Sequence, residues 1–178
     1  MMTTGTSATV ARLRLVASHG RRIDRHDRQL HILDVENGVG MGEITQADVA
    51  ALQSVYRDCV QPHSDAQFIG ATSSSSGLVA AALGWGRGPR WLHEDGPDGA
   101  DQCLVEELAH PKTAERYTHV VILSGDHAFA DVARALVASG VFVTVVSRPS
   151  SLNYRLRQNA SEVIYLPESS PVPAAKVA

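Results

Sequence analysis

The chain has 178 residues, of which 44% are apolar, and this is enough to build one domain around a single hydrophobic core. Its formal net charge of −3, from 16 basic and 19 acidic residues, excludes an overall electrostatic attraction to nucleic acid or to an anionic membrane. The N-terminus lacks the apolar run of a signal peptide and no apolar stretch approaches the roughly 20 residues needed to span a bilayer, so we expect a cytoplasmic protein with no membrane partner.

Composition divides the chain into three segments. Residues 1–28 are rich in arginine and poor in large apolar side chains, which predicts a flexible basic arm. Residues 29–167 have the pattern of a folded domain, and residues 168–178, which begin Glu-Ser-Ser-Pro-Val-Pro, have the composition of a disordered tail. Cys59 and Cys103 form no paired metal or redox spacing, which favours a reduced protein.

Within the predicted domain, short runs of Val, Ile and Leu alternate with stretches of helical spacing. This alternation is typical of βαβ units and therefore of a mostly parallel sheet. The predicted strands cover residues 30–35, 67–71, 90–93, 119–124, 141–147 and 162–166. We expect an α/β, Rossmann-like fold of three layers, with a strand order near 3-2-1-4-5.

Three helices are predicted between these strands. Thr45 and Asp48 form a capping box before a helix whose apolar residues share one face. A second helix spans about residues 100–109. A third carries an apolar stripe that begins at Phe129, and Gly140 stands where a helix end favours a left-handed residue.

Three aspartates fall where these elements end or begin. Asp34 ends the first strand and Asp126 follows the fourth, and ligands of open parallel sheets bind beyond the carboxyl ends of the strands. Asp101 lies in the first turn of the second helix, on the face of Leu104 and Leu108. Because a carboxylate on a buried face is costly unless it is paired or bound to metal, we expect these three to form one acidic site.

The chemistry follows from the charge of this site. Three converging carboxylates repel one another, and a hard divalent cation such as Mg²⁺ or Mn²⁺ relieves that repulsion. Asn37 would add a neutral oxygen or position a water, so the pattern favours metal-assisted attack of water on a phosphate. Each residue also has a structural interpretation, since Asp126 would cap a helix and Asp34 with Asn37 would build a turn.

Other polar residues leave two interpretations open. The run from Ser73 to Ser76 favours a helix cap over a phosphate cradle, because no Gly-Lys-Ser/Thr follows it. His127 would contact a substrate phosphate or face solvent. A set that follows the fifth strand would bind an RNA backbone near the acidic site, or form a solvated loop and helix face: Arg148, Ser151, Arg155 and Arg157.

These motifs resemble those of a known family. The run His-Val-Val-Ile-Leu-Ser-Gly-Asp-His-Ala-Phe-Ala from His119, followed by a helix, Gly140 and a strand, resembles the NYN branch of PIN-like nucleases. The segment from Leu33 to Asn37 resembles the family's opening Asp-x-x-Asn motif, and Gly99-Ala-Asp101 resembles its helix-borne central aspartate. The similarity covers roughly residues 30–167.

The resemblance implies a PIN-like fold, a Mg²⁺ or Mn²⁺ site and cleavage of RNA, most readily single-stranded RNA. By motif match, Asp34, Asp101 and Asp126 would be metal-binding carboxylates, with Asn37 and Ser124 supporting them. One position departs from the pattern, because the family often reads Ser-Gly-Asp-x-Asp-Phe and Ala128 replaces the second aspartate here. This departure puts a two-metal site in doubt.

The leading hypothesis from the sequence is therefore a metal-dependent ribonuclease. The alternative is a PIN-like module that binds RNA or protein without cutting, and a third class is a phosphohydrolase of small molecules, which would need a closed pocket or lid. The sequence leaves open the RNA substrate, endonucleolytic or exonucleolytic action, the biological pathway and whether the chain forms a homo-oligomer.

Overall fold

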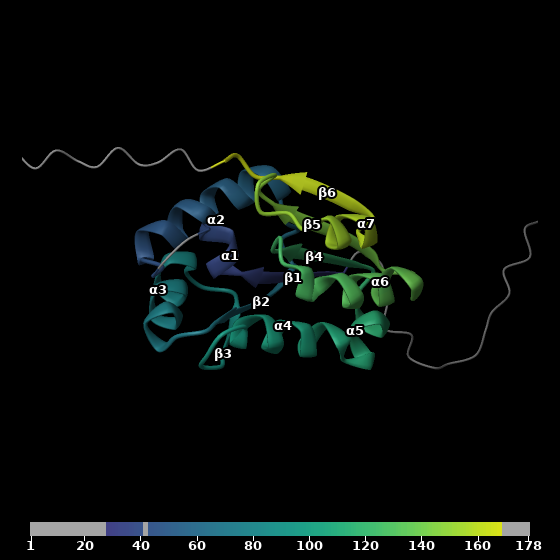
Figure 1. Ribbon diagram of the computed structural model, residues 1–178, viewed down its shortest axis with the longest axis horizontal. Helices are drawn as coiled ribbons and strands as arrows, with labels where there is room; N and C mark the ends of the chain where they lie inside the picture. The colour runs from purple at the N-terminus through teal and green to yellow at the C-terminus, as the bar shows by residue number, and fades with distance from the viewer. Residues whose placement is uncertain (1–27, 41–42, 169–178) are drawn as a thin grey trace, which may run out of the picture.

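The computed structural model describes residues 28–40 and 43–168. Six strands form one all-parallel sheet in the order β3-β2-β1-β4-β5-β6. Figure 1 shows them following one another from β6 at the top to β3 at the bottom. Their bounds are Gln29–Asp34 for β1, Gln67–Thr72 for β2, Arg90–His93 for β3, His119–Leu123 for β4, Phe142–Ser147 for β5 and Glu162–Tyr165 for β6.

The predicted fold class and strand order are confirmed, and β6 extends the order at the β5 edge. The central strands are apolar along nearly their whole length because a parallel sheet is covered by helices on both faces. β1 lies between β2 and β4, with Leu33 paired in register with Gly70 on one side and Leu123 on the other. The chain reverses its winding direction between β1 and β4.

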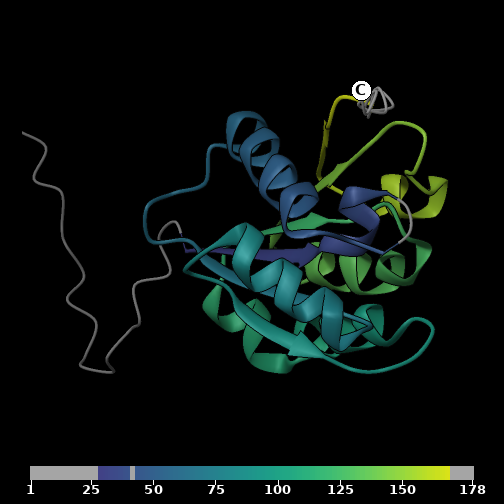
Figure 2. The same cartoon turned by 90° about the vertical axis from the view of Figure 1, so that its left-hand side faces the viewer.

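Two layers of helices enclose the sheet, as Figures 1 and 2 show. One core, which contains Leu33, Tyr56 and Trp85, lies beneath α1 (Val35–Val39), α2 (Gln46–Val60) and α3 (Ser75–Trp85). The other core, which contains Ile32, Leu104 and Phe129, lies beneath the second layer. That layer comprises α4 (Gly99–Ala109), α5 (Pro111–Arg116), the 3-10 turn η1 (His127–Phe129), α6 (Ala130–Ala138) and α7 (Tyr154–Asn159).

Local hydrogen bonds explain where several helices begin. The capping box before α2 is present, because the Asp48 amide donates to Thr45 Oγ1 at 3.2 Å and the Thr45 amide donates to Asp48 Oδ2 at 3.0 Å. Ser74 caps α3 by accepting from the Gly77 amide at 3.1 Å, as the cap interpretation of the serine run predicted. Gly140 follows α6 with a φ of +83°, the left-handed conformation expected there.

The three predicted helices are present as α2, α4 and α6, whereas α1, α3, α5 and α7 were not predicted as helices. Phe129 lies in η1 rather than in α6, and several strands begin or end one residue away from their predicted bounds. The predicted basic arm and C-terminal tail lie outside the described residues apart from Arg28 and Glu168. Within the described part of the chain, no helix combines the length and the hydropathy needed to cross a bilayer.

Candidate functional site

Asp34 occupies the end of β1, at the point where the winding of the sheet reverses. Its side chain is buried, with 3% of its surface exposed. Its Oδ1 accepts from the Asn37 amide at 3.1 Å, and its Oδ2 accepts from Ser124 Oγ at 2.8 Å. The carboxylate therefore caps α1 and at the same time stands at the position where parallel α/β sheets bind ligands.

The turn after β4 is locked to Asp34 and α1. Ser124 Oγ accepts from the Asp126 amide at 3.0 Å, and the Gly125 amide donates to Asn37 Oδ1 at 2.8 Å. A Cβ at Gly125 would lie 2.3 Å from the Ser151 carbonyl oxygen, so only glycine fits this turn. Through its side-chain oxygen, Asn37 therefore positions the turn that carries Asp126.

Asp101 brings a second carboxyl group to Asp34 from the first turn of α4. The two side chains line the same hollow and lie close enough for each to change the pKa of the other. Burial, and secondly the charge of Asp101, raises the pKa of Asp34 to about 7. Burial, and secondly the charge of Asp126, raises the pKa of Asp101 to about 6. Two carboxyl groups in this arrangement hold a proton between them near neutral pH, or a cation in its place.

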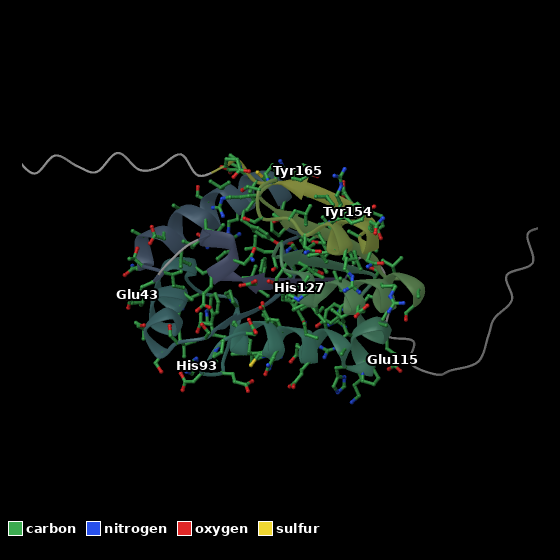
Figure 3. The ribbon with its side chains drawn as sticks, viewed as in Figure 1. Glu43, His93, Glu115, His127, Tyr154 and Tyr165 are labelled. Carbon is green, nitrogen blue, oxygen red and sulfur yellow. The ribbon has the colours of Figure 1, made fainter. Side chains whose placement is uncertain are left out.

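Asp126 combines the two interpretations that the sequence left open. Its Oδ1 accepts from the Ala128 amide at 2.7 Å, so the residue caps η1, and His127 Nδ1 lies 2.8 Å from the same oxygen. The His127 side chain is 69% exposed. Figure 3 shows His127 near the middle of the view, between the sheet and α4. Asp126 thus performs a structural task while its charge still acts on Asp101.

Two adjacent hollows define the shape of the site. One, of about 180 Å³, is lined by Asp34, Glu36, Asn37, Ser73, Asp98 and Asp101. The other, of about 260 Å³, is lined by Asp98, Asp101, Gln102, Asp126, His127 and Ala128. Asp98 and Asp101 line both, and neither hollow is lined by lysine or arginine. The site therefore gathers acidic side chains without a lysine or arginine in its walls.

Two of these acidic residues were missed by the sequence analysis. Glu36 accepts from the Ser73 amide at 3.0 Å and from Ser73 Oγ at 2.7 Å, and so ties α1 to the end of β2. Asp98 precedes α4 with a positive φ of 63°. Both lie within three residues of a predicted ligand, and that spacing was the available signal.

The fit of a metal ion follows from these contacts. Across residues 28–40 and 43–168, no three His, Cys, Asp or Glu side chains converge closely enough to hold a metal ion. Asp34 and Asp101 do meet, with Asp126 as a charged neighbour. A pair of carboxylates suits Mg²⁺, which binds through one or two carboxylates and keeps several waters. The donor set therefore fits a largely hydrated cation rather than one held by three side chains.

The predicted RNA-binding residues divide into two groups. Arg148 Nη1 donates to the Gly38 carbonyl, and its Nε is buried without a partner among the described residues, so this arginine supports α1. Arg155 and Arg157 lie exposed on α7, whose outer surface is marked by Tyr154 in Figure 3. Ser151 is exposed, with its carbonyl against Gly125. Of the predicted set, Ser151 and the two α7 arginines are therefore exposed enough to contact a phosphate.

Comparisons with known proteins address the fold alone. No family model and no curated protein matches the chain. Among solved structures, it is similar to a protein of unknown function from Vibrio parahaemolyticus RIMD 2210633, with a TM-score of 0.53 and 16% sequence identity over 82% of this chain and 96% of that one. This likeness is to the fold, and the all-parallel α/β sheet is compatible with a PIN-like architecture.

Proposed function

We propose that this protein is a metal-dependent ribonuclease that hydrolyses RNA phosphodiesters at the acidic site of Asp34, Asp101 and Asp126. The observation that carries the proposal is the contact between Asp34 and Asp101 at the β1–β4 crevice, in hollows lined by no lysine or arginine. Such a pair is costly when charged, and a divalent cation is the partner that removes the cost.

The residues of the site would divide the work. Asp34 and Asp101 would hold the cation directly, and Asp126 would act on it through a bound water. Ser124 and Asn37 orient Asp34 and the turn that carries Asp126. A bound Mg²⁺ or Mn²⁺ supplies a water of lowered pKa and neutralises charge that develops on the phosphate. Arg155 and Arg157 would hold the RNA backbone beside this site.

The alternative is a PIN-like module that binds RNA or protein without cutting it. Two observations favour this candidate. Ala128 stands where the family often has a carboxylate, and no set of three metal-binding side chains converges in the described residues. In this case Asp34 and Asp101 would have no catalytic role, and the exposed arginines of α7 would contact the bound RNA or protein.

Cleavage of a labelled single-stranded RNA by the purified chain tests the proposal. With Mn²⁺ or Mg²⁺ the wild type should cleave, and chelation should stop it. Asp34→Asn should lower the rate on the order of a thousandfold, because it removes a charged ligand. The matched control is Asp131→Asn, whose carboxylate is exposed and paired with Arg134 at 3.0 Å, and it should cleave like the wild type. Equal cleavage by wild type and Asp34→Asn would contradict the enzyme assignment.

A second variant separates the two candidates. Ala128 lies exposed in the lining of the second hollow, so Ala128→Asp adds the missing carboxylate without disturbing the core. An acidic residue at a helix start is also tolerated by the helix dipole. An inactive wild type together with an active Ala128→Asp variant would show a site disabled by one substitution. RNA binding without cleavage by either protein would support the binding module.

A further inference from the structure

A row of polar side chains crosses the sheet far from the acidic site, on the face that α2 covers. It starts at Tyr56 of α2 and continues through His31 and Gln29 of β1. The next three strands contribute one residue each, His119 of β4, Thr144 of β5 and Glu162 of β6. Parallel register places Gln29 opposite His119 and Thr144 opposite Glu162. His31, Tyr56 and Thr144 are buried.

Consecutive members of this row are within hydrogen-bond distance. Tyr56 Oη lies 2.6 Å from His31 Nδ1, and His31 Nε2 lies 3.2 Å from Gln29 Oε1. Gln29 Nε2 lies 3.2 Å from His119 Nδ1. His119 Nε2 then lies 2.9 Å from Thr144 Oγ1, which is 3.3 Å from Glu162 Oε2. The row is a continuous chain of hydrogen bonds from a helix to the edge strand.

The direction of the first half is fixed by a backbone group. The His63 backbone amide donates to Gln29 Oε1 at 3.3 Å. Because a backbone N–H can only donate, the side-chain atom of Gln29 that faces His63 and His31 must be its oxygen. His31 must then carry its hydrogen on Nε2, which donates to that oxygen. Its bare Nδ1 accepts the hydroxyl hydrogen of Tyr56.

The second half follows from the same constraint. Gln29 Nε2 can only donate, so His119 Nδ1 is bare and His119 Nε2 carries the hydrogen that goes to Thr144. The Thr144 hydroxyl in turn donates to the carboxylate of Glu162. Both histidines are therefore neutral and both have their hydrogen on Nε2.

The charged and titratable neighbours of His31 and His119 oppose the protonation of these two histidines unequally. Burial, followed by the nearby His119, His63 and Arg57, lowers the pKa of His31 to about 3. Burial also lowers the pKa of His119, and His63 adds to this effect, but Glu162 acts in the opposite direction. A proton that enters the chain is therefore taken by His119 first.

We propose that this chain of hydrogen bonds is an acid-triggered switch. When His119 binds one proton, the side-chain amide of Gln29 flips and the hydrogen of His31 changes from Nε2 to Nδ1. A hydrogen on His119 Nδ1 would face the amino group of Gln29, and only a turn of the amide supplies an acceptor. The amino group then faces His31 Nε2, which must become bare. The hydrogen of His31 moves to Nδ1, so the whole chain gains one proton and no other atom.

The consequence falls on α2. With a hydrogen on His31 Nδ1, the Tyr56 hydroxyl accepts instead of donating, and its own buried hydrogen loses the acceptor it had. The His63 amide loses its acceptor as well. α2 packs closely on α1, because a Cβ at Gly38 would lie 2.8 Å from Leu52 Cδ2. We therefore expect a change in the packing of α2 to affect the helix that carries Asn37.

Histidine ¹⁵N resonances of the full chain test the switch directly, because protonated and bare imidazole nitrogens differ strongly in shift. At pH 8 both His31 and His119 should show the Nε2–H tautomer. On acidification, His31 should change to the Nδ1–H tautomer with the same midpoint at which His119 becomes charged, before the protein unfolds. A His31 that begins as Nδ1–H, or that keeps Nε2–H while His119 titrates, would overturn the proposal.

Two variants identify the coupling residue. Gln29→Met keeps the side-chain length and removes both hydrogen-bonding atoms, so His119 should titrate without any tautomer change at His31. His63→Asn is the matched control, since it removes an exposed titratable group but keeps the backbone amide, and the coupled change should persist. Persistence in Gln29→Met would contradict the role of Gln29. If that variant does not fold, the wild-type titration decides alone.

Discussion

Strands β1 and β4 carry polar clusters at both of their ends, and the two clusters are built differently. At the amino end, each donor of His31, Gln29 and His119 meets an acceptor supplied by the protein. At the carboxyl end, Asp34 and Asp101 place two acidic groups against each other without a basic partner in the lining. A cluster completed by the protein stabilises the fold, whereas a cluster left with excess charge requires a ligand.

The largest expected effect concerns the stability of the metal-free protein. The pKa of Asp34 is raised from 3.8 to about 7 in the folded protein. The protonated Asp34 therefore stabilises the fold fully below pH 3.8, and this stabilisation is lost as the pH rises through 7. In the Asp34→Asn variant this side chain stays neutral at pH 8 and keeps an acceptor for the Asn37 amide. At pH 8 with chelator, this variant should be more stable than the wild type by on the order of 3 kcal/mol in denaturant unfolding.

Adding a divalent cation should reduce or reverse the difference in stability between Asp34→Asn and the wild type. Millimolar Mn²⁺ should raise the melting temperature of the wild type and leave Asp34→Asn unchanged, because only the wild type binds it. Asp131→Asn should behave as the wild type in both conditions. A destabilised Asp34→Asn variant at pH 8 would show that the carboxylate is already satisfied by the protein and would remove the contrast between the two clusters.

An intermediate effect is expected at the amino end. Tyr56→Phe removes the hydroxyl that donates to His31 Nδ1 and leaves a buried acceptor without a partner. Near neutral pH this should lower the free energy of unfolding by about 1 to 3 kcal/mol. The control is Tyr165→Phe at a 45% exposed position, which should change stability little. Equal stabilities for the two variants would mean that the hydrogen-bond chain contributes nothing.

The smallest effect concerns the arginines of α7. If Arg155 and Arg157 contact RNA phosphates, replacing both with alanine should reduce the slope of log affinity against log salt concentration by about 2. The comparison variant replaces Arg87 and Lys112, which are also exposed and basic. An equal change of slope in both variants would indicate general charge attraction rather than an RNA path along α7.

The fold was predictable because its signals are local. Continuous apolar runs mark the buried strands, and the capping box at Thr45 and the glycine after α6 mark helix ends at the residues themselves. The short helices α1, α5 and α7 were not predicted, since they have five or six residues and too few turns to show a period. The longer α3 was anticipated only by the serine cap at its start. The strand order followed from the arrangement that open parallel α/β sheets adopt around the point where their winding reverses.

The candidate site was predictable only in part. The meeting of Asp34 and Asp101 followed from strand ends and a helix face. The use of Asp126 as a third ligand stays a prediction, since its Oδ1 accepts from the Ala128 amide and no three metal-binding side chains converge in the described residues. The roles of Glu36 and Arg148 depend on Ser73 and Gly38, which lie far away in the sequence. His31 and His119 looked like ordinary strand residues, since their partners come from separate elements.

Calorimetric titration of Mn²⁺ into the metal-free protein tests the central claim most directly. The acidic pair should bind one cation near neutral pH with release of the proton it holds, so the measured heat should depend on the ionisation enthalpy of the buffer. Asp34→Asn and Asp101→Asn should each abolish this binding, and Asp131→Asn should retain it. Wild-type protein that binds no Mn²⁺, or binding that survives the loss of Asp34, would contradict a metal site at the carboxyl ends of β1 and β4.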